Sequence, residues 1–185
     1  MVYERDLLTS FPDSELKPLR AIEEKWDKGV YRPWCMYDGG EIVGSALVWQ
    51  YEPGWVLFDY LCVAAPHRND GIGSQIIAKL IEAERGNVVF GEAEVPDYAP
   101  DRAMAERRIG FYTRNGAKKA FYDTSIFGVA YHTLYWSERE IDENELLEKH
   151  RAIYKNQFSE PRYSKLFRIP WDASMGKTEL QPWDE

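Results

Sequence analysis

The chain has 185 residues, a length that suits one domain with a single hydrophobic core. Hydrophobic residues make up 44% and charged residues 29%, which is ordinary for a soluble globular protein. The 31 acidic residues outnumber the 23 basic ones, and the formal net charge of −8 argues against a nucleic-acid backbone as the main partner.

Apolar periodicity and turn residues predict an alternation of strands and helices. In chain order we expect a short strand over residues 1–5, a helix capped by Asp13 or Ser14 and ended by Gly29, and strands over 31–38, 41–51 and, at the centre, 55–63. A helix over 72–85, a strand over 87–95 and a helix over 102–114 follow. Strands over 118–125 and 128–136, a helix over 142–158, and a strand or extended arm over 167–171 complete the predicted elements. The residues from 173 onward lack periodicity and are expected to be loose.

Four further observations limit the class of protein. The two cysteines imply no disulfide framework, and the three histidines lie too far apart for a recognisable metal motif. The N-terminus lacks a basic and then apolar leader, and no apolar run reaches membrane-spanning length. We therefore expect a cytoplasmic protein that needs no metal and has no membrane or nucleic-acid partner.

Residues 55–85 read as a strand, a turn and a helix, and the rest of the chain is organised around them. The strand is apolar on both faces, as in a strand buried between layers. Pro66 ends it, because proline donates no backbone hydrogen bond. Arg68, Gly71 and Gly73 then precede a helix whose apolar residues recur at helical spacing.

The start of this helix is a candidate anion site. A helix start leaves about four N–H groups without intrahelical partners, and its dipole adds partial positive charge. The two glycines let a ligand approach these donors, and Arg68 stands beside them, so a pyrophosphate could bind here. The alternative is a sharp strand-to-helix turn that needs glycine only for its backbone angles.

Two known phosphate-binding motifs match this loop poorly. A P-loop has lysine and then serine or threonine after its last glycine, whereas Ser74 and Gln75 follow Gly73. A dinucleotide fingerprint has a third glycine where Ile76 stands, and it wants a tighter turn after the strand. An acidic residue, Glu92, does lie about 20 positions further on, as the dinucleotide fingerprint requires, so NAD binding is kept as the weaker alternative.

A third motif fits. The spacing Val63-x-x-x-x-Arg68-x-x-Gly71-x-Gly73, between an apolar strand and an amphipathic helix, resembles the acetyl-coenzyme A loop of the GNAT superfamily of N-acetyltransferases. The segment from Arg108 to Ala117, with its Phe-Tyr pair before a glycine, is similar to a later helix and turn of the same superfamily. The two motifs occur in the expected order with a strand between them.

The resemblance implies an α/β (α+β) fold, the GNAT acyl-CoA N-acyltransferase fold, in which a mixed central sheet with splayed parallel strands is flanked by helices. Acetyl-CoA would be the cosubstrate. The pantetheine arm would pair with the backbone of Leu61, Cys62 and Val63. The residues around the pyrophosphate would be Arg68, Asn69, Asp70, Gly71, Ile72, Gly73 and Ser74.

An acetyl transfer to an amine needs a proton acceptor, because an alkylamine is mostly protonated at neutral pH. The candidates are Asp59 on the central strand and Glu92 and Glu94 on the next strand. Glu92 and Glu94 are two residues apart and so project from one strand face, where they could serve as base or bind a cationic substrate. Glu94 is slightly favoured by its place at the end of the strand. Asp59 could instead have a purely structural role, and the two glutamates could simply lie on a solvent-exposed edge of the sheet.

The departing thiolate needs a proton donor, and the resemblance assigns this role to Tyr112. The alternative is a core tyrosine that packs the helix. The family often has asparagine seven residues earlier, where this chain has Ala105.

We expect an acetyltransferase domain over residues 1–136 and a C-terminal helical extension over 137–185, packed on the same domain or against the partner in a homodimer. The acceptor would be a small-molecule or peptide amine, attacking acetyl-CoA directly in a ternary complex. A non-catalytic CoA-binding or sensing module is the main alternative to an enzyme.

Overall fold

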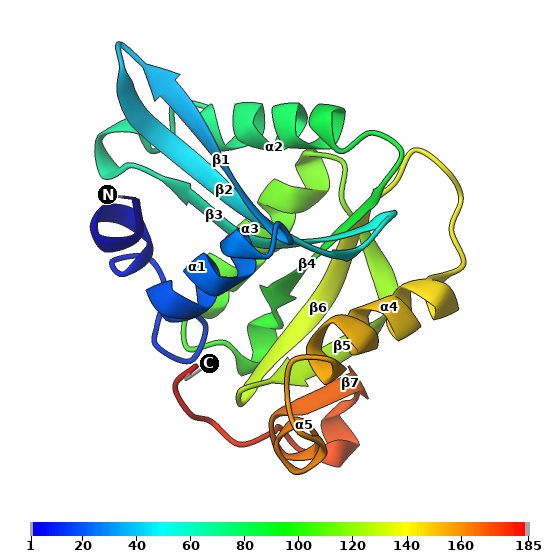
Figure 1. Ribbon diagram of the computed structural model, residues 1–185. Helices are drawn as coiled ribbons and strands as arrows, with labels where there is room; N and C mark the ends of the chain where they lie inside the picture. Colours follow the sequence, from blue (N-terminus) through cyan, green and yellow to red (C-terminus); the bar gives the residue numbers. More distant parts are fainter. Residues whose placement is uncertain (1, 184–185) are drawn as a thin grey trace. The chain divides into compact units, whose positions relative to one another are not determined.

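The computed structural model describes residues 2–183 and is a mixed α/β fold (Figure 1). The chain divides into two compact units, of which the first holds the described residues up to Val89 together with Trp183, and the second holds Phe90–Pro182. None of the helices in the described residues is long and apolar enough to cross a membrane.

The elements of the first unit come from the first half of the chain. They are η1 (Tyr3–Leu7), α1 (Leu19–Asp27), β1 (Tyr31–Asp38), β2 (Glu41–Glu52), β3 (Trp55–Val63), η2 (Ala65–His67) and α2 (Ile72–Ala83). The elements that follow are β4 (Val88–Glu94), η3 (Pro96–Tyr98), α3 (Arg102–Arg114), β5 (Lys118–Ile126), β6 (Val129–Trp136), α4 (Glu143–Lys155), α5 (Glu160–Leu166), β7 (Phe167–Trp171) and η4 (Ala173–Met175). The strand order in the mixed sheet is β1-β2-β3-β4-β6-β5-β7.

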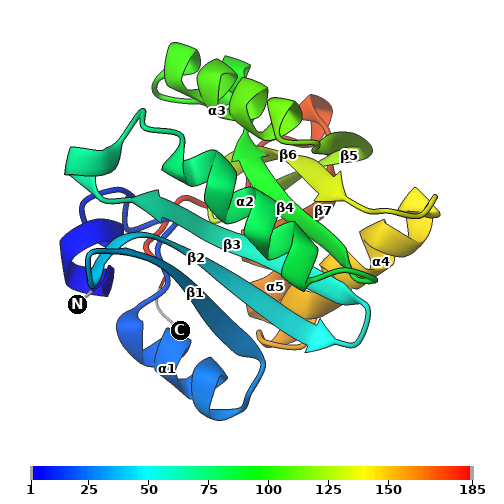
Figure 2. The same cartoon turned by 90° about the horizontal axis from the view of Figure 1, so that it is seen from above.

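In the first unit, β1, β2 and β3 form an antiparallel meander with Ser45 opposite both Cys35 and Cys62. The helix α2 packs against β2 and β3 (Figure 2). Gly44 permits this close contact, because a Cβ there would lie 2.7 Å from Ile76 Cδ1 and 3.1 Å from the Cys62 carbonyl oxygen. The strand β3 is buried along most of its length, which confirms the prediction from its apolar faces.

Residue Trp183 completes the core of the first unit, although it lies far along the chain. Its backbone N–H donates a hydrogen bond to the Asp13 carbonyl oxygen at 2.8 Å. Its ring lies against the Lys17 ammonium, with Nζ 4.2 Å from the ring centroid. Trp183 thus packs with residues of the first unit that precede it by more than 160 positions in the sequence.

In the second unit, β5 pairs antiparallel with both β6 and β7. Figure 2 shows α3 and α4 on opposite sides of these strands. The helix α4 packs on β5 and β7. Between them the rings of Tyr154 and Phe167 stack at 4.9 Å, and Phe127 and Phe158 lie against Phe167.

Two expectations about the first 30 residues are wrong. The strand over residues 1–5 is instead the π-helical turn η1, which buries Leu7; Met1 itself lies outside the described residues. The first helix begins only at Leu19, because Pro18 disfavours helical angles at the residue before it and takes an extended conformation itself (ψ 144°).

The expectation of a loose tail after residue 173 is also wrong. Thr178 is buried, its N–H donates to Ser125 Oγ at 2.9 Å, and its hydroxyl accepts from the Gly128 N–H at 2.9 Å. The short helix α5 lay outside the predicted elements, whereas the strand predicted over residues 167–171 is present as β7.

Candidate active site

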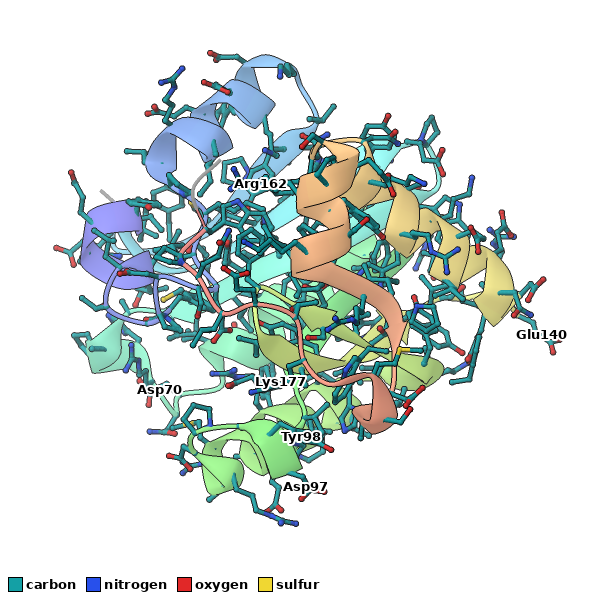
Figure 3. All side chains as sticks on the ribbon, turned by 90° about the horizontal axis from the view of Figure 1, so that it is seen from below. Asp70, Asp97, Tyr98, Glu140, Arg162 and Lys177 are labelled. Atoms are coloured by element: carbon teal, nitrogen blue, oxygen red, sulfur yellow. The ribbon has the colours of Figure 1, made fainter. Side chains whose placement is uncertain are left out.

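The loop between β3 and α2 has the geometry of a helix-start anion site. Gly71 is the N-cap of α2 and takes a left-handed conformation (φ 80°), which a glycine adopts without strain. Asn69 is also left-handed (φ 74°), and Asp70, labelled in Figure 3, is exposed in the same loop. The first N–H groups of α2 therefore follow directly on a turn that has no side chain at Gly71.

Arg68 is held beside this helix start by the end of β3. Its Nε donates to the Val63 carbonyl oxygen at 3.2 Å, and one terminal nitrogen lies 3.4 Å from Ser10 Oγ. The side chain is otherwise exposed. A tethered guanidinium in the loop that leads into a helix start suits the binding of a phosphate oxygen.

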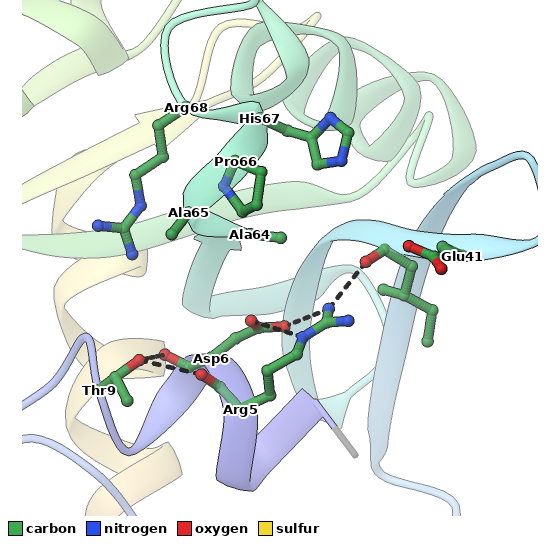
Figure 4. A pocket seen from close by; sticks show the side chains of 10 residues that line it. Arg5, Asp6, Thr9, Glu41, Ala64, Ala65, Pro66, His67 and Arg68 are labelled. Carbon is green, nitrogen blue, oxygen red and sulfur yellow. Dashed lines mark hydrogen bonds and ion pairs between the residues drawn. The ribbon is translucent and has the colours of Figure 1, made fainter.

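A pocket of about 200 Å³ adjoins this loop (Figure 4). It is lined by Arg5, Asp6, Thr9, Glu41, Ile42, Ala64, Ala65, Pro66, His67 and Arg68. Arg5 already binds the Asp6 carboxylate, at 2.9 and 2.7 Å, and the Ile42 carbonyl oxygen at 2.8 Å. Its charge is therefore partly satisfied inside the protein, which leaves Arg68 as the better anion ligand.

The three strand residues expected to hold pantetheine lie at the end of β3. Cys62 is buried, with Sγ 3.3 Å from Ser10 Oγ, and Leu61 and Val63 are half-buried. Burial raises the pKa of the Cys62 thiol, which disfavours the thiolate and hence a nucleophilic role. Cys62 and Cys35 are both free thiols.

Asp59, one of the three candidate bases, forms a buried ion pair. Lys17 Nζ lies 2.7 and 2.8 Å from its two carboxylate oxygens, and the Tyr31 hydroxyl donates to it at 2.5 Å. The side chains of Lys17 and Asp59 are only 1% and 6% exposed. These contacts favour the structural alternative for Asp59, because a base must be free to receive a substrate proton.

The neighbouring Lys25 lies over the Trp49 ring at 5.0 Å, and burial together with the charge of Lys17 lowers the pKa of its ammonium to about 8. The folded protein thus disfavours the charged form, so we expect Lys25→Met to be more stable than wild type at pH 7. The difference in unfolding free energy between the two proteins should shrink between pH 8 and about 10.5, because in this range folded wild type has lost the Lys25 proton while its unfolded chain still binds it. Urea unfolding of both proteins at pH 7, 8.5 and 10 measures it, and Lys28→Met, at an exposed position, should show no such trend.

Glu92 and Glu94 lie on one face of β4, as predicted, but each has its own partners. Glu94 forms an ion pair with Arg108 of α3 at 2.7 Å. Glu92 accepts from His150 Nε2 at 2.7 Å and from the Tyr154 hydroxyl at 3.0 and 3.1 Å. The two carboxylates are therefore held by separate donors from two different helices.

Tyr112 lies on α3, half-buried between Phe111 and Trp136, with ring centroids 5.4 and 5.9 Å away. Burial raises the pKa of its phenol, while the charge of Arg108 acts in the opposite direction. A phenol that keeps its proton at neutral pH is a competent hydrogen-bond and proton donor.

Sequence reasoning missed Lys17 and His150, which hold two of the candidate carboxylates. The sequence carried one indication of His150, namely a histidine on the apolar face of the helix predicted over residues 142–158. Its partner could not be identified, because Glu92 is 58 residues away. The same holds for Lys17 and Asp59, which are 42 residues apart.

Solved structures with a similar fold come from several bacteria. A protein from Bacteroides thetaiotaomicron assigned to the GNAT acetyltransferases has a TM-score of 0.66 and 22% identity, over 80% of this chain and 84% of its own. The ribosomal-protein-S18-alanine N-acetyltransferase from Escherichia coli has a TM-score of 0.53 and 13% identity, over 77% and 87%. A GNAT acetyltransferase from Elizabethkingia anophelis with acetyl-CoA bound has a TM-score of 0.51 and 11% identity, over 64% and 82%. At these identities the likeness is one of fold.

A comparison with curated proteins found no match. The sequence model of the acetyltransferase (GNAT) family matches residues 2–111, which is more than half of the 185 residues and includes both motifs that carried the resemblance, the second up to Phe111. This chain belongs to the GNAT acetyltransferase family.

Proposed function

We propose that the protein transfers the acetyl group of acetyl-CoA to a primary amine by direct attack in a ternary complex. The observation that carries the proposal is the loop at the start of α2, where Arg68 and the left-handed Gly71 flank a helix N-terminus in a chain of the GNAT family. The fold neighbour from Elizabethkingia anophelis, which holds acetyl-CoA, supports the choice of cosubstrate.

In this proposal the backbone of Leu61, Cys62 and Val63 pairs with the pantetheine arm. The pyrophosphate binds at the residues Arg68, Asn69, Asp70, Gly71, Ile72, Gly73 and Ser74. Gly71 and Gly73 matter because they leave the helix N–H groups accessible, and Arg68 adds a charged donor.

The chemistry then needs two protons to leave the nitrogen and one to reach the departing sulfur. The acceptor arrives as an ammonium, gives one proton to a carboxylate, and attacks the thioester carbonyl carbon as the free amine. The new C–N bond forms, the C–S bond breaks, and the nitrogen loses a second proton to solvent. Tyr112 gives a proton to the departing thiolate and regains one from solvent. Glu92 and Glu94 are the carboxylates available for the first step, whereas we assign Asp59 to the structure.

The acceptor class follows only coarsely from charge. A net charge of −8 and the acidic pair on β4 favour an amine that is cationic, either a small molecule or a peptide. We retain residues 1–136 as the proposed acetyltransferase domain and 137–185 as its extension, with the homodimer and the cytoplasmic location as further proposals.

A thermal-shift titration with acetyl-CoA, CoA and NAD tests the cosubstrate. A ligand at about 100 times its dissociation constant adds about 2.7 kcal/mol to the unfolding free energy, which raises the melting temperature measurably. We expect stabilisation by the two CoA species only. Arg68→Ala should weaken acetyl-CoA binding about 10-fold, through the loss of a charge-assisted hydrogen bond, whereas Arg20→Ala, on the exposed face of α1, should leave it unchanged.

Three results would contradict the proposal in different ways. Stabilisation by NAD alone would restore the dinucleotide reading of the loop. An unchanged melting temperature with all three ligands would mean that the loop is only a strand-to-helix turn. Tight CoA binding, without thiol release from acetyl-CoA in a panel of spermidine, tryptamine and an alanine-terminated peptide, would favour a non-catalytic CoA-binding module.

A further inference from the structure

The carboxylate of Glu92 lies at the end of a buried chain of hydrogen bonds in the second unit. His150 is 0% exposed, and both of its ring nitrogens have partners: Nε2 lies 2.7 Å from Glu92 Oε1, and Nδ1 lies 3.1 Å from the Tyr122 hydroxyl. The rings of Phe90, Tyr122 and Tyr154 surround the imidazole at 5.0, 5.9 and 5.7 Å, so its orientation is fixed. Glu92 itself is 14% exposed.

The partners determine where the protons lie. An ionised carboxylate only accepts, so Nε2 of His150 carries a proton and donates it to Glu92. Burial raises the pKa of the Tyr122 phenol well above its ordinary value, so that hydroxyl stays protonated and can donate to Nδ1. A neutral imidazole with its proton on Nε2 thus satisfies every group in the chain.

Glu92 and Glu94 therefore differ in the charge they present. Glu94 faces the permanent cation of Arg108, which neutralises it. Glu92 is held by two donors, His150 and Tyr154, that need not carry charge, so neither contact sets a permanent cation against its carboxylate. The other charged groups near this chain are Glu143 and Arg151, both on α4.

We infer that Glu92, rather than Glu94, binds the acceptor ammonium and takes its proton, and that His150 and Tyr154 are positioning residues that keep this carboxylate ionised and fixed. The inference rests on the proposed function. Oε2 receives only the shared Tyr154 hydroxyl among the contacts described here, so it is the oxygen that accepts the proton. His150 lies on α4, beyond residues 2–111 that match the family model.

The kinetic test compares wild type with His150→Leu and His150→Gln, using the amine from the panel that gives the highest turnover. Loss of the His150 donor makes the ionised form of the carboxylate less favourable, so the acid limb of kcat/KM should move to higher pH in His150→Leu, with activity about 10- to 100-fold lower. His150→Gln retains an N–H donor and should keep the limb near its wild-type position. Glu92→Gln should abolish the limb.

His132→Leu is the matched control, because His132 also contacts a carboxylate, Asp123, at 2.8 Å in the same unit. It should leave the limb in place. A merely structural role for His150 would lower the melting temperature and activity of His150→Leu without moving the limb, and that result would overturn the inference.

A second readout needs no cosubstrate. Long-range ¹H–¹⁵N spectra of histidine-labelled protein should show His150 as the neutral Nε2–H tautomer, with its signal assigned from the His150→Gln variant. The Nδ1–H tautomer would overturn the inference even if acetyl-CoA binds and turns over. Conversely, the expected tautomer together with no CoA binding would show that the proposed function, and with it the role in catalysis, is wrong.

Discussion

Replacing Lys17 by methionine should lower the free energy of unfolding by about 3–5 kcal/mol, because it leaves the Asp59 carboxylate buried without its cation. Both side chains are almost completely buried, and the ammonium reaches both carboxylate oxygens. Its position between the rings of Trp49, Tyr60 and Trp183, at 5.5, 5.3 and 4.2 Å, adds cation–π attraction that methionine lacks. Urea unfolding at pH 7 measures the loss.

The double variant Lys17→Met/Asp59→Leu separates the missing cation from general damage to the core. Removing both charges should restore much of the stability, because a buried ion pair replaced by apolar groups is often close to neutral. An exposed pair serves as the comparison: Arg20 is 89% exposed beside Glu24, and Arg20→Ala should leave stability nearly unchanged. If Lys17→Met resembled Arg20→Ala, Asp59 would not depend on its partner, and its place among the candidate bases would reopen.

Replacing Gly128 by alanine should cost about 2–4 kcal/mol, from a left-handed backbone and a steric overlap together. Gly128 has φ +82°, and a Cβ built on it would lie 2.5 Å from Leu180 Cα and 2.7 Å from Leu180 N. These are backbone atoms, so the clash cannot be relieved by a side-chain rotation. The tail would have to move away and give up the hydrogen bonds of Thr178 to Ser125 and Gly128.

Gly40→Ala is the control for the backbone contribution alone. Gly40 is equally left-handed (φ +88°), but a Cβ there would meet no atom within 4 Å. Its cost should be about 1–2 kcal/mol, and the excess for Gly128→Ala, measured by thermal or urea unfolding, reports the contact with Leu180. Equal losses in the two variants would mean that the tail does not pack on Gly128.

The sequence predicted the central elements well where one strong periodicity and clear turn residues agreed. The helix over residues 102–114 is present with those bounds, because Asp101 caps it through the Met104 N–H and Asn115-Gly116 ends it. The first helix was misplaced because the effect of Pro18 on Lys17 outweighed the good capping residues before it. The tail was misjudged because the burial of Thr178 depends on contacts more than 50 residues away.

The candidate site divides in the same way. The loop from Arg68 to Ser74 is a local feature, so the glycines before an apolar-periodic segment were enough to predict a strand-to-helix turn, and the helix α2 begins there after the left-handed Gly71. The roles of the carboxylates are not local. The alternation of β4 predicted that Glu92 and Glu94 share a face, but what each of them touches comes from α4 and α3, and no periodicity specifies those pairings.

The place of Trp183 in the core of the first unit bears on how the protein folds during synthesis. At roughly 5–20 residues per second, the ribosome adds residue 183 several seconds after residue 89 has been made. Until then the Lys17 ammonium lacks the Trp183 ring, and the Asp13 carbonyl oxygen lacks its donor. The first unit is therefore translated before the second, but its core is completed only after the second unit has been synthesised.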